Sequence, residues 1–166
     1  MSTTPKPRPP STSRTMMTEL VLPPHGNAVG TAFGGTILSW IDVCAGIAAQ
    51  RFCGHVAVTA AIDEMQFLAP VHVGDVVSLT GFVNASFNTS IEVEVIVEKE
   101  PPESLERTLC ADAKLTFVAI DADGRPALAP PVQCETPEEH QRYQEALERR
   151  NQRLERKRSR RARANS

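Results

Sequence analysis

The chain has 166 residues, of which 41% are hydrophobic and 23% charged, as is typical of one soluble domain with its own hydrophobic core. Its formal net charge is −2, but residues 149–166 carry nine Lys or Arg and one acid, so residues 1–148 carry about −10 by the same count. The acidic body argues against a nucleic-acid-binding domain. No apolar segment approaches the ~20 residues of a membrane-spanning helix, so no membrane partner is expected.

The first segment, residues 1–15, is rich in Pro, Ser and Thr and lacks the apolar stretch of a secretory signal. Its clustered prolines oppose an amphipathic helix. We expect a disordered tail here and a cytoplasmic protein. The four cysteines show neither a CxxC pair nor metal-ligand spacing, which is typical of small buried residues in a reducing compartment and gives no reason to expect a metal.

A strand at residues 16–22 is followed by a Gly-rich loop and then by residues 34–50, which are apolar on all sides. Such a segment predicts a helix that other structure covers. The next segments predict long antiparallel strands over residues 54–67, 75–87, 89–100 and 107–120. In the third of these strands, Glu92, Glu94 and Glu98 alternate with apolar residues, which indicates one buried and one solvent-exposed face.

The remaining chain is a Pro-rich spacer at residues 122–136 and a charged helix with a basic tail at residues 137–166. Nothing in residues 149–166 resembles core, so we expect a solvated end whose removal leaves the domain folded and dimeric. A basic end can also contact phosphate groups or RNA, and the sequence leaves that alternative open.

These elements predict an α+β domain over residues 16–121. One curled antiparallel sheet must cover the apolar helix, because no other segment is apolar enough to do so. A sheet wrapped around one long helix is the hotdog fold. Its free edge strand and the uncovered part of the helix predict that two copies pair into a continuous sheet.

The predicted helix contains one charged side chain. Asp42 is the only Asp, Glu, Lys, Arg or His between His25 and Arg51. Burying a carboxylate is costly unless it is paired, which favours a functional role for Asp42 over a capping role. Its neighbours one helical turn away include Ser39 and Gly46, which predict a narrow polar notch that admits a thioester and a water molecule.

Three motifs follow one another in order and spacing: Asn27-x-x-Gly30, then Gly34-Gly35 with Asp42, then FLAPVHVGD at residues 67–75. With the strands around them, these motifs resemble the acyl-CoA thioesterase family of hotdog proteins, over about residues 16–120. The relevant branch includes the short bacterial acyl-CoA hydrolases and the tandem-domain brain-type enzymes.

The resemblance implies an enzyme that hydrolyses acyl-CoA, with Asp42 as the catalytic carboxylate and Asn27 as its partner across a dimer. It implies no cofactor, since coenzyme A is part of the substrate and product. Trimers of dimers are common in that family. Related hotdog enzymes with a helix Glu often carry a helper Thr one turn later, whereas this chain has Gly46.

Thioester hydrolysis needs an activated oxygen nucleophile and donors for the developing oxyanion. The N–H groups of Gly34 and Gly35 at the start of the helix are candidate donors, although the glycines equally suit a tight turn. Asp42 lies eight residues beyond Gly34, about 12 Å along a helix, so both act on one thioester only if they come from different subunits.

Other residues are weaker candidates. Asn27 also suits a turn, and His25 is more typical of a solvated loop residue than of a base. A thiolate pair of Cys53 and His55 is geometrically allowed, but a buried cysteine is favoured. Asp63 and Asp75 suit turns and strand ends. Candidate contacts to the pantetheine arm are Thr59, Asn88, Thr89 and Ser90.

Two other functions compete with thioesterase activity. The first is a non-catalytic acyl-CoA-binding module or regulator. The second is a hotdog dehydratase, which ranks last because the helix and the loop before it supply only one histidine, His25. The sequence determines neither the acyl chain length nor whether Asp42 acts as a general base or attacks directly to form an anhydride.

Overall fold

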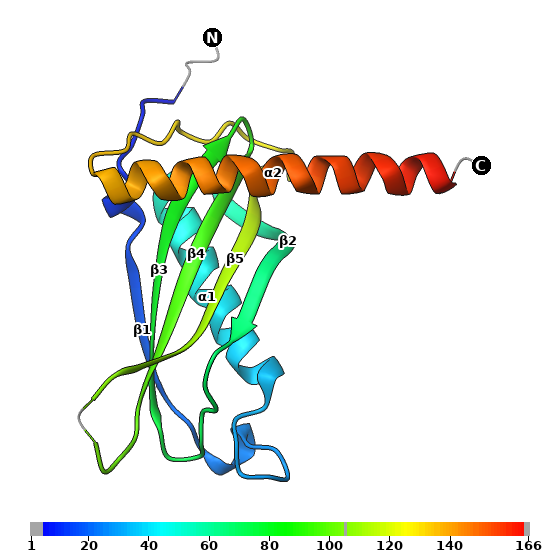
Figure 1. Cartoon of the computed structure of the whole chain (residues 1–166). Coiled ribbons are helices and arrows are strands. Elements are labelled where there is room, and N and C mark those ends of the chain that lie inside the picture. Colours follow the sequence, from blue (N-terminus) through cyan, green and yellow to red (C-terminus); the bar gives the residue numbers. More distant parts are fainter. Residues whose placement is uncertain (1–4, 105, 165–166) are drawn as a thin grey trace.

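The computed structural model describes residues 5–104 and 106–164, so residues 1–4 of the expected tail lie outside the described part. In chain order the elements are η1 (Pro10–Ser13), β1 (Thr15–Leu20), η2 (Pro23–His25), α1 (Gly34–Cys53), β2 (Val56–Phe67), β3 (Val76–Phe87), β4 (Ser90–Glu100), β5 (Thr108–Ile120) and α2 (Pro137–Ala164), where η marks a 3-10 turn (Figure 1). Neither described α-helix is long and apolar enough to cross a membrane.

The strands form one antiparallel sheet in the order β1-β3-β4-β5-β2, which curls around α1 (Figure 1). The inner side chains of β4 and β5 pack against the buried side of α1, which includes Ile37, Ile41 and Phe52. This is the predicted α+β hotdog fold, and the prediction is confirmed. The sheet order leaves β1 and β2 as edge strands.

The close packing of α1 on the sheet depends on Gly81 in β3. A Cβ at this position would lie 3.0 Å from Cys44 Sγ and 3.3 Å from the Cys44 carbonyl oxygen. The small residues Ala45, Ala48 and Ala49 of α1 are fully buried in the same core. Glycine in the strand therefore lets the helix approach the sheet closely, which sets where the other side of α1 lies.

The outer face of the sheet differs from the prediction. Glu92 was expected on a solvent-exposed face, but it is only 1% exposed because α2 lies across the outer face of the sheet (Figure 1). The covering side of α2 includes the fully buried Ala146 and two arginines stacked on aromatic rings: Arg142 on Phe82 and Arg150 on Phe87. The charged helix expected from residue 137 therefore packs on the sheet through its first part, since arginine stems cover apolar surface.

Two further arginines of α2 neutralise carboxylates on the outer face. Arg149 pairs with Glu92 at 2.7 Å, and Arg153 pairs at 2.7 Å with Asp63, which also accepts a hydrogen bond from Thr116. Burial opposes the charge of Arg149, but hydrogen bonds to Glu92 raise its pKa overall. The expectation of a solvated end is therefore wrong at Arg149 and Arg153, and Asp63 serves a mid-strand ion pair rather than a turn.

The N-terminal segment is also ordered where it is described. Arg8 donates a 2.7 Å hydrogen bond to the Phe52 carbonyl, and Ser13 is fully buried and accepts a bond from the Val83 N–H at 2.9 Å. Arg8 also forms backbone bonds to Pro131 and Gln133 of the expected spacer. The prediction of a disordered tail is wrong for residues 5–15, because their backbone polar groups find partners on the domain.

Gly81→Val should destabilise the domain by about 1–3 kcal/mol, since the added methyl groups overpack the contact with Cys44. Urea unfolding followed by circular dichroism measures the change. Gly46→Ala is the matched control, because its Cβ would meet Phe117 at an ordinary 3.6 Å. Equal stability of the two variants would contradict the close helix–sheet contact.

Arg149→Ala should lower the free energy of unfolding by about 2–4 kcal/mol, because it leaves the buried Glu92 carboxylate unpaired. The exposed Arg158→Ala should change it by less than about 0.5 kcal/mol. Adding Glu92→Gln to the first variant should recover part of the loss. A loss no larger than that of the control would show that α2 does not neutralise Glu92.

Candidate active site

The site begins with a hydrogen bond between α1 and β2. Thr59 Oγ1 donates to Asp42 Oδ1 at 2.6 Å. The helix ends at Gly54, whose φ of +73° turns the chain back, so β2 runs beside α1 in the opposite direction. Thr59 was expected to contact substrate only. Its pairing with Asp42 was not predicted, although the short link between α1 and β2 was a usable signal.

The predicted polar notch is built differently from expected. Ser39 donates its hydroxyl hydrogen to the Thr36 carbonyl at 2.8 Å, within the helix. Gly46 faces the Phe117 ring, and a Cβ placed on Gly46 would lie 3.6 Å from that ring. The hydroxyl beside Asp42 therefore comes from Thr59 on the edge strand, while the carboxylate itself is half-buried.

Asn27 organises the loop before α1. Its Oδ1 accepts hydrogen bonds from the N–H groups of Val29 at 3.0 Å and Thr31 at 3.2 Å, and its Nδ2 donates to Thr31 Oγ1 at 2.8 Å. The turn role considered for Asn27 is therefore real. A carboxamide has two N–H groups, so the exposed Asn27 keeps a second donor in addition to the one used by Thr31.

The start of α1 offers backbone donors. Phe33 precedes the helix and provides no side-chain cap, so the N–H groups of Gly34 and Gly35 point out of the first turn without an acceptor in the helix. A groove of about 380 Å³ adjoins this end and is lined by Gly34, Phe67, Leu68 and other mostly apolar residues. Donors at a helix start beside an apolar groove suit the oxyanion and tail of an acyl group.

The described residues form two separate groups in one chain. Asp42 and Thr59 form one group. Gly34 and Gly35 at the start of α1 form the other, directly after the loop that Asn27 organises. α1 is a continuous helix from Gly34 to Cys53, so eight residues separate Gly34 from Asp42, about 12 Å along the axis. A single thioester carbon cannot contact both groups within one chain.

The β3–β4 turn contains three of the other candidates. Asn88, at φ 49°, accepts a hydrogen bond from the Ala129 N–H at its carbonyl, Thr89 accepts one from Ala119, and Ser90 donates to Phe87. In the sheet, Ser90 of β4 pairs with Val118 of β5, and Val118 pairs with Val58 of β2, the residue before Thr59. The turn thus lies at the Thr59 end of the sheet. Contacts of these residues with substrate stay a prediction.

The alternative bases and nucleophiles have other roles. His25 Nδ1 accepts a hydrogen bond from the Leu22 N–H at 3.1 Å, and its ring packs edge-on against Trp40. Burial raises the pKa of the Cys53 thiol, which donates to the His55 carbonyl, so a thiolate pair is not favoured. Within residues 5–104 and 106–164, no group of three His, Cys, Asp or Glu side chains is arranged to hold a metal.

The edge strand beside the site exposes apolar side chains. Val56, Val58, Ile62 and Phe67 of β2 are between 44% and 57% exposed, and the outward-facing edge of β2 has no partner among the described strands. β2 has 12 residues, twice as many as the other edge strand, β1. A long apolar edge of this kind is suited to pair with another strand.

Comparison with known proteins identifies the relationship. Residues 29–106 match the family described as the thioesterase superfamily. An uncharacterized acyl-CoA thioester hydrolase of Bacillus subtilis is 41% identical over 93% of this chain and 90% of its own length. Acyl-coenzyme A thioesterase 11 of Mus musculus is 39% identical over 90% of this chain, which spans only 25% of that longer protein.

Solved structures agree in fold. An acyl-CoA hydrolase from Bacillus cereus superposes with a TM-score of 0.89 at 37% identity, covering 96% of this chain and 98% of its own. A hexameric acyl-CoA thioesterase gives 0.87 at 40% identity, covering 91% and 97%. The hydrolase of Staphylococcus aureus, solved with butyryl coenzyme A and coenzyme A, gives 0.83 at 32% identity, covering 95% and 94%.

A maleimide probe at neutral pH should label the folded protein once, at the partly exposed Cys134. The other cysteines are buried, and burial raises the pKa of both Cys44 and Cys110 to about 11, so they are protonated thiols at neutral pH. Mass spectrometry should find four labels only after denaturation. Rapid labelling of Cys53 in the folded chain would restore the thiolate alternative.

Proposed function

The chain belongs to the thioesterase superfamily, and from that premise we propose that it hydrolyses acyl-CoA at two composite sites in a homodimer. The observation that carries the proposal is the Thr59–Asp42 hydrogen bond, which lies about 12 Å along α1 from the helix start. One subunit contributes Asp42 and Thr59. The other contributes Asn27 with the N–H groups of Gly34 and Gly35.

Asp42 activates the nucleophile. Thr59 donates to Oδ1 and fixes the orientation of the carboxylate, which leaves Oδ2 to accept a proton from water. The water oxygen attacks the thioester carbon, and the C–S bond then breaks. The sulfur takes up the proton that Asp42 accepted from the water and leaves as the thiol of coenzyme A, which returns Asp42 to its carboxylate form. Direct attack by Asp42 to give an anhydride that water then hydrolyses is the other route, and both give the same products.

The second subunit stabilises the oxyanion. Asn27 is held by its own loop through Oδ1, so its remaining N–H is preorganised toward the thioester oxygen. The first N–H groups of α1 add the positive end of the helix dipole. The apolar groove beside Gly34 is suited to the acyl group. Every step uses only water and groups of the chain, so this scheme requires no cofactor or metal.

The same geometry supports a particular arrangement of the dimer. A Cβ placed on Gly34 would lie 3.4 Å from the Phe67 ring, so these two residues are neighbours. Asp42 and Thr59 are joined by their hydrogen bond. A twofold axis that joins Asp42 of one copy to the Gly34 region of the other must also bring Thr59 toward Phe67 of the second copy. The two β2 strands then pair antiparallel about Asp63, midway between them, and bury their apolar edges.

Variants of a relative support this choice of residues. The hydrolase of Staphylococcus aureus has been solved with an asparagine, an aspartate or a threonine replaced by alanine. These residues are spaced 15 and 17 positions apart in that chain, as Asn27, Asp42 and Thr59 are in this one. Hexameric thioesterases among the similar structures support trimers of the proposed dimer, and relatives named as cytosolic support a cytoplasmic location.

Asp42→Asn should leave the protein folded and lower kcat for acyl-CoA by at least ~10²-fold, and Thr59→Val should lower it about tenfold, because the base is lost in one and misoriented in the other. Release of free thiol from a panel of acyl-CoAs measures both rates and the acyl preference. Ser39→Ala is the matched control, since that hydroxyl bonds within the helix. Undiminished turnover by folded Asp42→Asn would refute the role of Asp42, whereas a wild-type protein that releases no thiol from any acyl-CoA would favour the non-catalytic binding module.

A further inference from the structure

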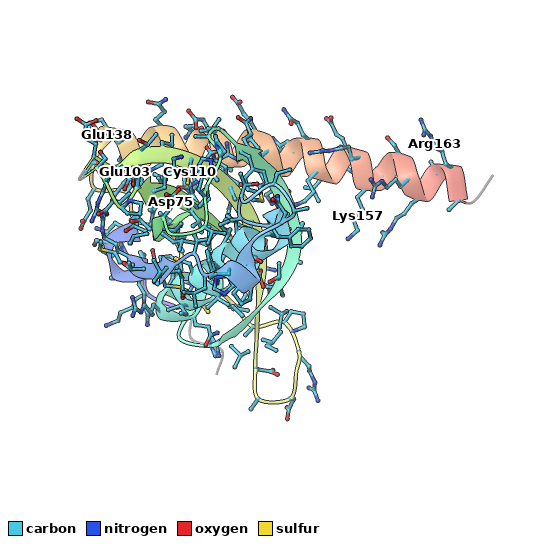
Figure 2. All side chains as sticks on the ribbon, turned by 90° about the horizontal axis from the view of Figure 1, so that it is seen from below. Asp75, Glu103, Cys110, Glu138, Lys157 and Arg163 are labelled. Carbon is cyan, nitrogen blue, oxygen red and sulfur yellow. The ribbon has the colours of Figure 1, made fainter. Side chains whose placement is uncertain are left out.

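The second half of α2 extends beyond the domain. Arg153 is the last residue of α2 that forms an ion pair with the described sheet, and it meets Asp63 on the edge strand. Residues 154–164 continue the helix past β2, about 16 Å at 1.5 Å per residue (Figure 1). Figure 2 shows Lys157 and Arg163 on this free part of the helix. We call residues 154–164 the overhang.

One side of the overhang continues the side of α2 that covers the sheet. Residues that cover the sheet recur every three or four positions, as Ala146, Arg149 and Arg153 do, and the next in this series are Lys157, Arg160 and Arg161. These three line a groove of about 500 Å³ with Ala60, Ala61 and Ile62 of β2, whereas Arg158 and Arg163 do not. The basic side of the overhang therefore covers a space just outside the free edge of the sheet.

The outer face of the sheet carries unbalanced negative charge near this edge. Lys114 lies 2.6 Å from Asp112 and 3.7 Å from Glu94, and the charge of Glu64 also acts on it. Burial opposes the charge of Lys114, but these carboxylates raise its pKa overall. Asp112 Oδ1 is buried without a hydrogen-bond partner in the described part of the chain. We call Glu64, Glu94 and Asp112 the acidic cluster.

If the sheet continues into a second copy, the length of the overhang matches the distance from β2 to the strands of that copy that carry the acidic cluster. Neighbouring strands are about 4.8 Å apart, so β2 and β5 of the second copy lie roughly 5 and 10 Å beyond β2. Lys157 and Arg161 lie about 6 and 12 Å beyond Arg153 along the helix. The basic side of the overhang then lies above the strands that carry Glu64 and Asp112 in the second copy.

We propose that the overhang is an intersubunit clasp: Lys157, Arg160 and Arg161 of one copy pair with the acidic cluster on the outer face of the second. This inference rests on the β2-edge dimer of the proposed function, and twofold symmetry gives two such clasps per dimer. The clasp gives the basic end of α2 a partner of opposite charge, which is a second copy of this chain. In the described residues, none of these three cations forms an ion pair within its own chain.

Crosslinking tests the clasp separately from the dimer. In a Cys134→Ser background, chains with Glu64→Cys are mixed and refolded with tagged chains that carry Lys157→Cys, and a short bismaleimide is added. Each chain then has one accessible thiol, so a tagged–untagged product is intermolecular. Lys157→Cys should crosslink efficiently, while Arg158→Cys, on another side of the helix, should not.

A third mixture distinguishes the two possible failures. Ile62→Cys should crosslink to Glu64→Cys, because pairing about Asp63 brings these positions opposite each other. If the Ile62 product forms and the Lys157 product does not, the clasp is wrong and the dimer holds. If neither forms, the β2-edge dimer fails, and the clasp fails with it.

Charge reversal gives a second test that needs no cysteine. Lys157→Glu/Arg160→Glu should raise the dimer dissociation constant roughly tenfold to a hundredfold in low salt, since several exposed ion pairs become repulsive in each dimer. Arg158→Glu/Arg163→Glu has the same charge change and should raise it less than about threefold. Sedimentation equilibrium measures both constants, and equal effects of the two variants would overturn the clasp.

Discussion

The length of a helix constrains the whole account. α1 carries its first N–H groups at Gly34 and its single carboxylate at Asp42, and a rigid helix keeps these groups about 12 Å apart. No side-chain rotation brings them to one carbonyl carbon. Catalysis that uses both groups therefore needs a second copy of the chain, and the exposed apolar edge of β2 next to Thr59 is where the described structure can accept one.

The outer layer serves a different physical purpose. Glu92 and Asp63 are carboxylates on a face that α2 removes from water, and Arg149 and Arg153 neutralise them there. The last of these pairs lies on the edge strand. The same helix that stabilises one subunit thus reaches the edge at which a second copy would join, and the proposed clasp would extend a packing pattern already present within the chain.

The hydrophobic pattern predicted the fold well. The helix at residues 34–50 could be located because it is apolar on all sides over helical length, the strand at residues 89–100 because its residues alternate, and the apolar helix required a sheet to cover it. The alternation of polar and apolar residues was less informative about what covers the outer face of the sheet. The alternation of Glu92 and Glu94 with valines is the same whether water or an arginine-rich helix covers the glutamates, so sequence alone could not predict the position of α2.

The site was predicted in part. Asp42 was recognisable because it is the only charge in the apolar segment 34–50. Its bond to Thr59 depends on how β2 lies against α1, which no local pattern contains. Asn27 kept two interpretations because a turn residue and an oxyanion donor use the same carboxamide, and the loop hydrogen bonds use only part of it. The structure of the N-terminal segment depends on distant partners such as Phe52, so composition alone misjudged it.

Complementation between two inactive variants tests the composite site most directly. Asn27→Ala and Asp42→Asn chains, each nearly inactive alone, are mixed in equal amounts, refolded and assayed for thiol release, with heterodimers confirmed by differential tagging. Random pairing of copies makes about half of the dimers heterodimers, each with one intact site of two, so roughly a quarter of the wild-type activity per subunit should return. If Asn27 and Asp42 act within one chain, every site stays broken, and confirmed heterodimers without activity would contradict the shared site.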